Sequence, residues 1–341
     1  MMKNKNISIL KGLLVKKKNI VIIPHMSPDG DAIGSSLALM HILNKTGHKT
    51  TVASPNEPPY FLRWTPGYNK IIYFDNDKEM CGSKIQNADI IFTLDFNDLN
   101  RIGEMGELVK SSKSSIVMID HHQNPKNYTD IVFSEPSIGS TCELLYEIII
   151  QLGYEKVINF EIASCIYLGI MTDTGSFQFS SVSSRTHEII GKLINKDINQ
   201  SEIHNKVYNG SSISRLKVLG SALSNLNQIK ELNTAYMFLK RDDLKKFNFK
   251  KGDSEGIVNY GLSLNKIIFS VIFIEDMDDV NKIKISFRSQ GNFSCNEFAQ
   301  KYFNGGGHIN AAGGIDNGPL EKTINKFKKE INKNKNKLII N

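Results

Sequence analysis

The sequence predicts an α/β protein of two domains, in which a doubly wound, mainly parallel sheet is followed by a smaller C-terminal α/β domain. Apolar runs of strand length alternate with helix-like segments in the first half of the chain, and polar residues stand where the apolar runs end. The composition then changes after about Arg185. Alternating strands and helices are typical of a parallel sheet covered on both faces. A chain of 341 residues is long for one domain and suits two.

The first domain is predicted from apolar runs that end in polar residues. Strands are expected at 20–24, 49–53, 88–95 and 115–119, and helices at 32–46, about 140–152 and 160–171. In a doubly wound sheet the carboxyl ends of the strands lie along one edge, where such folds bind their ligands. The polar groups that follow these strands are therefore expected to meet there. Asp173 follows a helix, so a loop has to bring it to that edge.

The second domain is predicted from a later set of strands. The chain becomes polar and helical after about Arg185, and strands return at 234–239, 266–275 and 282–288. The segment GGGHINAAGG at 305–314 indicates a turn that opens into a short helix, and the Asn- and Lys-rich end is expected to fray. The predicted boundaries are 1–190 for the first domain, 191–232 for a helical connector packed on it, 233–330 for the second domain and 331–341 for a basic tail.

The composition bounds the kind of partner that the protein binds. The formal net charge is +7, but seven lysines against two glutamates lie from Glu321 to the end, so the rest of the chain is nearly neutral. Long nucleic acids are usually bound through many cationic contacts, which this balance does not favour. The four cysteines lack CxxC spacing and are typical of reduced thiols in a cytoplasmic protein. No signal peptide and no run of roughly 20 apolar residues is recognised, so no membrane partner is expected.

The stretch HMSPDGDAIGS places His25, Asp29 and Asp31 within seven residues, where an apolar strand turns into a helix. One interpretation is an Asx-rich turn with Asp31 as the helix N-cap, since Asp is a preferred cap and turn residue. The other is a metal site, because a cap needs one carboxylate and a second one nearby adds repulsion unless a cation neutralises it. Pro28 and Gly30 bend the backbone, which lets the carboxylates converge. The stretch alone leaves both interpretations open.

The other polar groups at the predicted strand and helix ends favour the metal site. The full set is His25, Asp29, Asp31, Asp95, Asp120, His121, His122 and Asp173. Imidazole and carboxylate ligands together suit Mn²⁺, Fe²⁺ or Zn²⁺ better than Mg²⁺. This number of ligands exceeds what one ion uses and suits two, which is the usual arrangement for hydrolysing phosphate esters. His122 could then face the substrate and stabilise charge on the phosphoryl group.

Four motifs of the first domain, HMSPDGDAIGS, LDFND, DHH and GIMTDTGSF, resemble in order and spacing the signature motifs of the DHH phosphoesterase superfamily. GGGHINAAGG resembles the glycine-rich motif of the associated DHHA1 domain. The resemblance covers roughly residues 15–320. A short chain that holds both domains and little else resembles the NanoRNase/pAp phosphatase (NrnA-like) subfamily.

The resemblance implies a role for each matched residue of the first domain. Two Mn²⁺ ions are expected in the active site, the first held by His25, Asp29 and Asp95, the second by Asp31, Asp95, His121 and Asp173. His122 is expected to contact the scissile phosphate, and Asp120 to lie behind the ligands. The expected catalytic residues are therefore His122, Asp95 and Asp120.

The expected substrate contacts lie in the second domain. Arg288 ends a predicted strand, where an arginine could clamp a phosphate through two parallel hydrogen bonds. The glycines at 305–307 could simply make a turn, but without Cβ atoms they also let backbone N–H groups approach a phosphate or base. The expected substrate-binding set is His122, Arg288, Ser289, Gly305, Gly306, Gly307 and His308.

The function implied by the resemblance is hydrolysis of very short RNA or DNA oligonucleotides. Expected substrates are nanoRNA, linear dinucleotides such as pApA and pGpG, and 3′-phosphoadenosine 5′-phosphate (pAp), with a homodimer left open as the assembly. An inorganic pyrophosphatase is an alternative, but the GGGH motif argues against it. A RecJ-like single-strand exonuclease would need an added nucleic-acid-binding module. A non-catalytic nucleotide sensor is the third alternative, and the complete ligand set argues against it.

Overall fold

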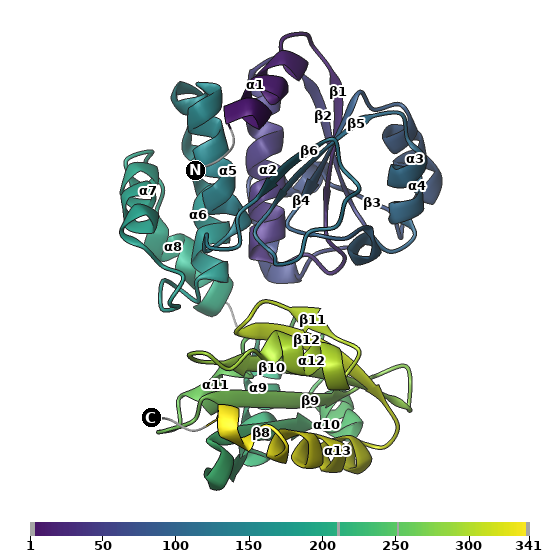
Figure 1. Ribbon diagram of the computed structural model, residues 1–341, viewed down its shortest axis with the longest axis vertical. Coiled ribbons are helices and arrows are strands. Elements are labelled where there is room, and N and C mark those ends of the chain that lie inside the picture. Colours follow the sequence, from purple (N-terminus) through teal and green to yellow (C-terminus); the bar gives the residue numbers. More distant parts are fainter. Residues whose placement is uncertain (1–3, 210–211, 251, 339–341) are drawn as a thin grey trace. The chain divides into compact units, whose positions relative to one another are not determined.

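The computed structural model describes residues 4–209, 212–250 and 252–338, which form two compact units that divide near residue 210 (Figure 1). Both units combine a sheet with helices, so the predicted mixed α/β class is confirmed. Every helix in these ranges is too short or too polar to cross a membrane. The four cysteines of the sequence are buried, and none of them forms a disulfide.

The first unit is built on a fully parallel sheet with the strand order β3-β2-β1-β4-β5-β6, counted over its described residues. The strands are β1 (Asn19–Pro24), β2 (Lys49–Ser54), β3 (Ile72–Tyr73), β4 (Ile90–Leu94), β5 (Ser115–Asp120) and β6 (Ile131–Ser134). The helices are α1 (Asn4–Leu13), α2 (Gly30–Lys45), α3 (Lys78–Gln86), α4 (Met105–Ser111), α5 (Thr141–Leu152), α6 (Phe160–Asp173), α7 (Ser184–Ile194) and α8 (Gln200–His204). The order reverses between β1 and β4, so the carboxyl ends of these strands flank a topological switch point.

Side chains of the parallel strands alternate between two cores. In β1, Ile20 and Ile22 join the core under α2, α5 and α6, whereas Val21 and Ile23 join the core under α3 and α4. Figure 1 shows these two groups of helices on opposite faces of the sheet. Because both faces are covered, the central strands β1, β4 and β5 are apolar over most of their length, which is the pattern that predicted a doubly wound sheet.

Close packing of α2 against α6 brings distant residues to one edge of this sheet. A Cβ atom at Gly34 would lie 2.5 Å from the carbonyl oxygen of Cys165, and one at Gly169 would lie 2.5 Å from Oδ1 of Asp31. Glycine is therefore required at both positions. Asp173 is the last residue of α6, and this packing carries it to the N-terminus of α2. The prediction that a loop brings Asp173 to the edge was wrong, because a helix contact does so.

The second unit holds a mixed sheet with the order β11-β12-β10-β9-β8-β7 over its described residues, in which only β8 and β9 pair in parallel. The strands are β7 (Asn227–Ile229), β8 (Thr234–Leu239), β9 (Phe269–Glu275), β10 (Lys282–Ser289), β11 (Gly306–Gly307) and β12 (Ala311–Asn317). The helices are α9 (Ile213–Ser224), α10 (Arg241–Lys246), α11 (Asn259–Leu262), α12 (Cys295–Tyr302) and α13 (Leu320–Asn332). Phenylalanines of β9, β10, α12 and α13 pack together under one face of the sheet.

The prediction of a turn into a short helix at 305–314 was wrong. This segment forms the β11–β12 hairpin, in which Gly306 pairs with Gly313 and Gly307 with Ala312. Glycine is a poor helix former, and five of the ten residues at 305–314 are glycines. A short edge strand made of glycines is then more favourable than a helix.

The predicted boundaries differ from the observed ones in the connector and in the basic tail. The predicted connector is divided, since α7 and α8 belong to the first unit, and α9 and β7 belong to the second. The predicted fraying of the basic tail was wrong for residues 331–338, because Ile331 and Leu338 are buried in the phenylalanine core. Ile324, Phe327 and Ile331, at helical spacing along α13, also anchor this lysine-rich end, and residues 339–341 lie outside the described ranges.

Candidate active site

The turn after β1 combines a helix cap with a group of acidic and imidazole side chains. Asp29 is the N-cap of α2, because its Oδ1 accepts hydrogen bonds from the backbone N–H groups of Asp31 (3.0 Å) and Ala32 (3.1 Å). Its other oxygen, Oδ2, lies 3.8 Å from Nε2 of His25. The capping interpretation was therefore right about the turn and wrong about the residue, since Asp31 is not the cap.

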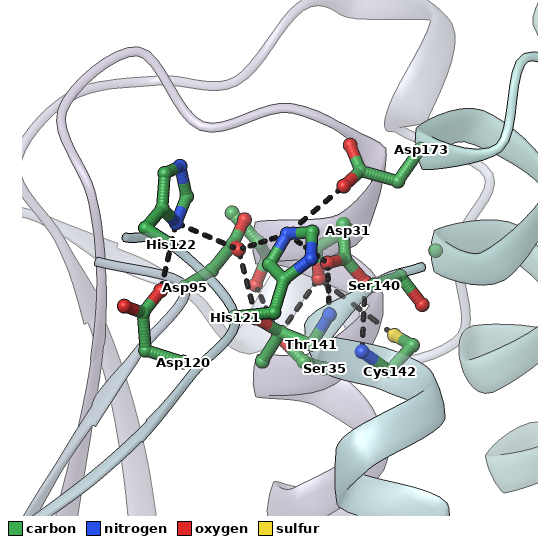
Figure 2. A network of polar contacts seen from close by, with 12 residues as sticks. Asp31, Ser35, Asp95, Asp120, His121, His122, Ser140, Thr141, Cys142 and Asp173 are labelled. Atoms are coloured by element: carbon green, nitrogen blue, oxygen red, sulfur yellow. Dashed lines mark hydrogen bonds and ion pairs between the residues drawn. The ribbon is translucent and has the colours of Figure 1, made fainter. Parts of the chain in front are cut away.

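Asp31 is instead held by the N-terminus of α5. Its Oδ2 accepts a hydrogen bond from the backbone N–H of Thr141 at 2.6 Å, and its Oδ1 accepts one from that of Cys142 at 2.9 Å (Figure 2). The side chain is completely buried. Two amide donors at the positive end of a helix dipole offset part of the cost of burying this carboxylate.

Asp95 lies between His25 and His121. It follows β4 with a backbone φ of 66°, a conformation that is strained for residues other than glycine and is often found at functional sites. Oδ1 accepts a hydrogen bond from the hydroxyl of Thr141 at 2.8 Å and lies 3.6 Å from Nε2 of His121. Oδ2 lies 3.5 Å from Nε2 of His25. Each oxygen of this carboxylate thus faces a different imidazole.

Both imidazoles are oriented in the same way. Nδ1 of His25 lies 2.9 Å from the carbonyl oxygen of Met26, and Nδ1 of His121 lies 3.1 Å from that of Ile138. Nδ1 therefore carries the donated proton, and Nε2 is turned toward carboxylates, including Oδ2 of Asp173 at 3.0 Å from His121. A backbone carbonyl on one nitrogen is the usual partner of a histidine whose other nitrogen binds a metal.

The donor atoms form two groups that fit divalent cations. Within each group the ligand atoms lie within 4.8 Å of one another, and the groups are His25, Asp29 and Asp95, and Asp31, His121 and Asp173. Asp95 also approaches His121 of the second group, so its carboxylate lies between the two groups of donors. Mixed nitrogen and oxygen donors of this kind suit first-row transition metals.

Without a bound cation, protons on the histidines and carboxylates of the cluster neutralise part of its negative charge. Burial lowers the pKa of His25, but the carboxylates of Asp29 and Asp95 outweigh this effect and raise the pKa to about 10. For His121, burial is likewise outweighed by Asp173, and the pKa is raised. Burial, together with the charge of Asp95, raises the pKa of Asp31. A divalent cation would replace these protons and relieve the repulsion among the carboxylates.

His122 stands beside the cluster and is oriented by Asp120. Its Nδ1 lies 2.7 Å from Oδ1 of Asp120, which ends β5 and is completely buried, and 3.8 Å from Oδ1 of Asp95 (Figure 2). Asp120 accepts the proton on Nδ1, so Nε2 is the nitrogen through which His122 can act on a ligand. The ligand atoms of Asp95, Asp120 and His122 also lie within 4.8 Å of one another, which makes a metal site an alternative use of this pair.

Three residues that support the cluster were missed by the sequence analysis. Thr141 and Cys142 hold Asp31 through backbone N–H groups, which leave no trace in the sequence. Asn56 accepts a hydrogen bond from the N–H of Ser27 at 2.6 Å and so fixes the turn after His25. The sequence signal for this support was Ser140 followed three residues later by Glu143, a capping pattern that marks the start of α5.

The predicted substrate residues of the second unit gather at the end of β10 and on β11. Arg288 donates a hydrogen bond to the carbonyl oxygen of Phe287 at 3.0 Å, and no carboxylate of the described ranges pairs with it. The hydroxyl of Ser289 donates to the carbonyl oxygen of Phe293 (2.6 Å) and accepts from the side-chain amide of Asn310 (2.9 Å). Arg288 therefore has a charge to offer a ligand, whereas Ser289 is buried and engaged in the fold.

The glycine-rich motif lies at the edge of the second sheet. The N–H of Gly305 donates to the carbonyl oxygen of Ala299 at 3.2 Å, and that of His308 donates to the carbonyl oxygen of Ala311 at 2.6 Å. Gly306 and Gly307 make up β11, which pairs only with β12 among the described strands. Backbone groups of this edge are thus presented without side chains to cover them.

A buried carboxylate and imidazole cluster that fits divalent cations, at the switch point of a parallel sheet, is typical of a metal-dependent hydrolase. Comparison with known proteins agrees with this class. The description "DHH family, N-terminal domain" matches residues 19–170, and "DHHA1 domain" matches residues 231–337. The chain belongs to the DHH family of phosphoesterases and is an enzyme of that type, which confirms the resemblance seen in its motifs.

Three relatives illustrate how much of the chain is shared. The bifunctional oligoribonuclease and PAP phosphatase NrnA of Bacillus subtilis is 29% identical over 86% of this chain and 88% of its own length. The protein of the same name from Thermus thermophilus is 28% identical over 86% of this chain and 83% of its own. The crystal structure of an exopolyphosphatase-related protein from Bacteroides fragilis is 42% identical, covers 98% of both chains and superimposes with a TM-score of 0.94.

Proposed function

We propose that this enzyme is a two-metal phosphodiesterase that hydrolyses short oligonucleotides to mononucleotides and pAp to AMP. The observation that carries the proposal is Asp95, whose two oxygens face the two imidazoles of a single cluster. The relatives named oligoribonuclease and PAP phosphatase support the substrate class, since they match most of the chain. The nearly neutral body supports a short substrate of about two to five nucleotides.

The proposed metal ligands are the residues that the sequence motifs predict. His25, Asp29 and Asp95 would hold one Mn²⁺, and the second would be held by Asp31, Asp95, His121 and Asp173. When bound, the two ions supply an activated water and neutralise charge on the phosphoryl oxygens. The protein contributes the fixed donors: α5 orders Asp31 and Asp95, and backbone carbonyls turn Nε2 of both histidines inward.

The remaining residues are proposed to bind and orient the nucleotide. His122 would donate from Nε2 to the scissile phosphate as an imidazolium, whose other N–H, on Nδ1, donates to Asp120 and orients the ring. Arg288, the glycines at 305–307 and His308 would bind the part of the nucleotide that does not react. Ser289 would support this contact through its bond to Asn310 and not touch the substrate. A cytoplasmic location and a homodimer are part of the same proposal.

Rates on five substrates test the proposed activity against its alternatives. The assay compares pAp, pApA, pGpG, a five-nucleotide RNA and pyrophosphate under one set of conditions with Mn²⁺. We expect kcat/KM to be highest on the short nucleotides. A preference for pyrophosphate would support the pyrophosphatase alternative, and processive loss of long single strands would support a RecJ-like enzyme. Binding without turnover of any nucleotide would indicate a sensor.

Replacing Arg288 tests the division of labour between metal cluster and nucleotide contacts. The Arg288→Ala variant is expected to lose about ten- to a hundredfold in kcat/KM on pApA, since a charge-assisted phosphate contact contributes roughly 1.5–3 kcal/mol. An activated phosphodiester without the second nucleotide should lose much less, and bound metal should not change. The control is Lys284→Ala, which removes a cation from the same face of β10. Equal losses on both substrates would place Arg288 at the reacting phosphate.

The raised pKa values of the histidines predict how metal affinity depends on pH. The carboxylates raise the pKa of His25 to about 10, so the ring is protonated in the metal-free enzyme at neutral pH and must lose a proton to bind a cation. Affinity for Mn²⁺ should therefore rise from about pH 6 toward about pH 10, and activity lost at low pH should return with excess Mn²⁺. Calorimetry in two buffers of different ionisation enthalpy measures the proton release. An affinity that does not change with pH would contradict the assignment of His25 as a ligand.

A further inference from the structure

The three glycines at 305–307 differ in whether the fold requires them. A Cβ atom at Gly305 would collide with the carbonyl oxygen of Gly313, and one at Gly307 would collide with that of Ala311. At Gly306 the nearest atom would be 3.8 Å away, which is an ordinary van der Waals contact. The fold therefore requires glycine at positions 305 and 307 and would accept alanine at 306.

A side chain at position 306 would lie next to two side-chain amide groups of α12. A Cβ atom there would lie 3.8 Å from Oδ1 of Asn296 and 3.9 Å from Nε2 of Gln300. The two residues are four positions apart, so they lie on the same face of α12, which packs against β11 and β12 (Figure 1). An acceptor and a donor thus stand side by side where the edge strand has no side chain.

No hydrogen bond within the described part of the chain accounts for the buried side-chain oxygen of Asn296. The residue is 5% exposed, and its Oδ1 is buried without a hydrogen-bond partner in the described ranges. The N-terminus of α12 is already capped by Ser294, whose side chain accepts a hydrogen bond from the N–H of Glu297 at 3.2 Å. A buried carbonyl oxygen without a donor destabilises a protein, so a donor supplied by a ligand would stabilise Asn296.

We propose that Asn296 determines substrate specificity by accepting a hydrogen bond from the nucleoside, which reaches it across Gly306, while Gln300 donates to the neighbouring acceptor. The inference rests on the proposed function and adds to it a site that reads the nucleoside. An amino group beside a ring nitrogen, as on adenine, presents this pair of donor and acceptor, and so do the two hydroxyls of a ribose.

Two variants test the site without disturbing the hairpin. Asn296→Ala is expected to lower kcat/KM on pApA about three- to tenfold, the usual effect of one neutral hydrogen bond, without lowering Tm. Gly306→Ala should cause a similar loss by covering the amide groups, because its methyl group has room in the fold. Asn332→Ala at the exposed end of α13 is the matched control and should leave kcat/KM unchanged.

Substrate analogues identify which part of the nucleoside is read. The wild type and Asn296→Ala are compared on pApA, on its 2′-deoxy counterpart and on a dinucleotide of purine riboside, which lacks the amino group. If the penalty for the missing amino group disappears in the variant, Asn296 reads the base. If the penalty for the missing hydroxyl disappears, it reads the ribose, and either result supports the site.

Other results separate this inference from the proposed function. Full kcat/KM of Asn296→Ala on all three substrates would overturn the role of Asn296. So would a lowered Tm together with unchanged losses of kcat/KM for the missing amino group and the missing hydroxyl. Both results would leave the proposed function intact. A wild-type enzyme that turns over none of the short nucleotides would instead contradict the proposed function.

Discussion

The Asp95→Asn variant is expected to lose both activity and bound metal. Loss of a group that merely supports a metal ligand usually lowers affinity or activity ten- to a hundredfold, so loss of a shared ligand should exceed about a hundredfold. Asparagine keeps the shape of the side chain, tolerates the left-handed backbone at this position and can still accept the hydrogen bond from Thr141. What it removes is the negative charge that faces both imidazoles.

Elemental analysis and kinetics on the same preparation measure this effect. Asp75→Asn, a change of the same kind at an exposed aspartate, is the control and should retain full activity and full metal content. Asp95→Ala should show the same losses with lower stability, because alanine is strained at a φ of 66°. An inactive Asp95→Asn protein with unchanged metal would mean that Asp95 acts on the substrate and does not join the two ions.

The members of the cluster could be predicted because parallel sheets impose one rule on all their strands. His25, Asp95 and Asp120 each follow or end an apolar run, and the carboxyl ends of such runs meet at one edge. What the motifs left undetermined was how each charge is kept in place. Asp31 depends on two backbone amides of α5, and no side-chain pattern encodes the direction of an amide.

The second unit was less predictable for a related reason. A run of glycines has neither the period of a helix nor that of a strand, so the segment at 305–314 gave no basis for choosing a hairpin. Its pairing with β10 depends on long-range contacts, such as the N–H of Ser289 donating to the carbonyl oxygen of Asn310 at 2.9 Å. The lysine-rich end was misjudged because charge hid the apolar spacing of Phe327 and Ile331.

Replacing His122 is expected to lower kcat about a hundred- to a thousandfold while bound metal stays unchanged. That range is typical for removing one donor that stabilises charge in a transition state. The contact of Nδ1 with Asp120 at 2.7 Å is the reason, because it leaves Nε2 to serve the phosphoryl group. His41→Ala, which changes a histidine outside the cluster, is the control for loss of an imidazole. Metal analysis and kcat on pApA check the result.

A double-mutant cycle then decides what Asp120 contributes. If Asp120 acts only by orienting His122, Asp120→Asn should lower kcat in the wild type and have no further effect in the His122→Ala background. The proximity of Asp95, Asp120 and His122 allows the opposite assignment, in which the pair binds a cation directly. In that case each single variant would lose metal, and excess Mn²⁺ would restore part of the rate. Unchanged metal with strongly non-additive rates would therefore assign His122 to the substrate and Asp120 to His122.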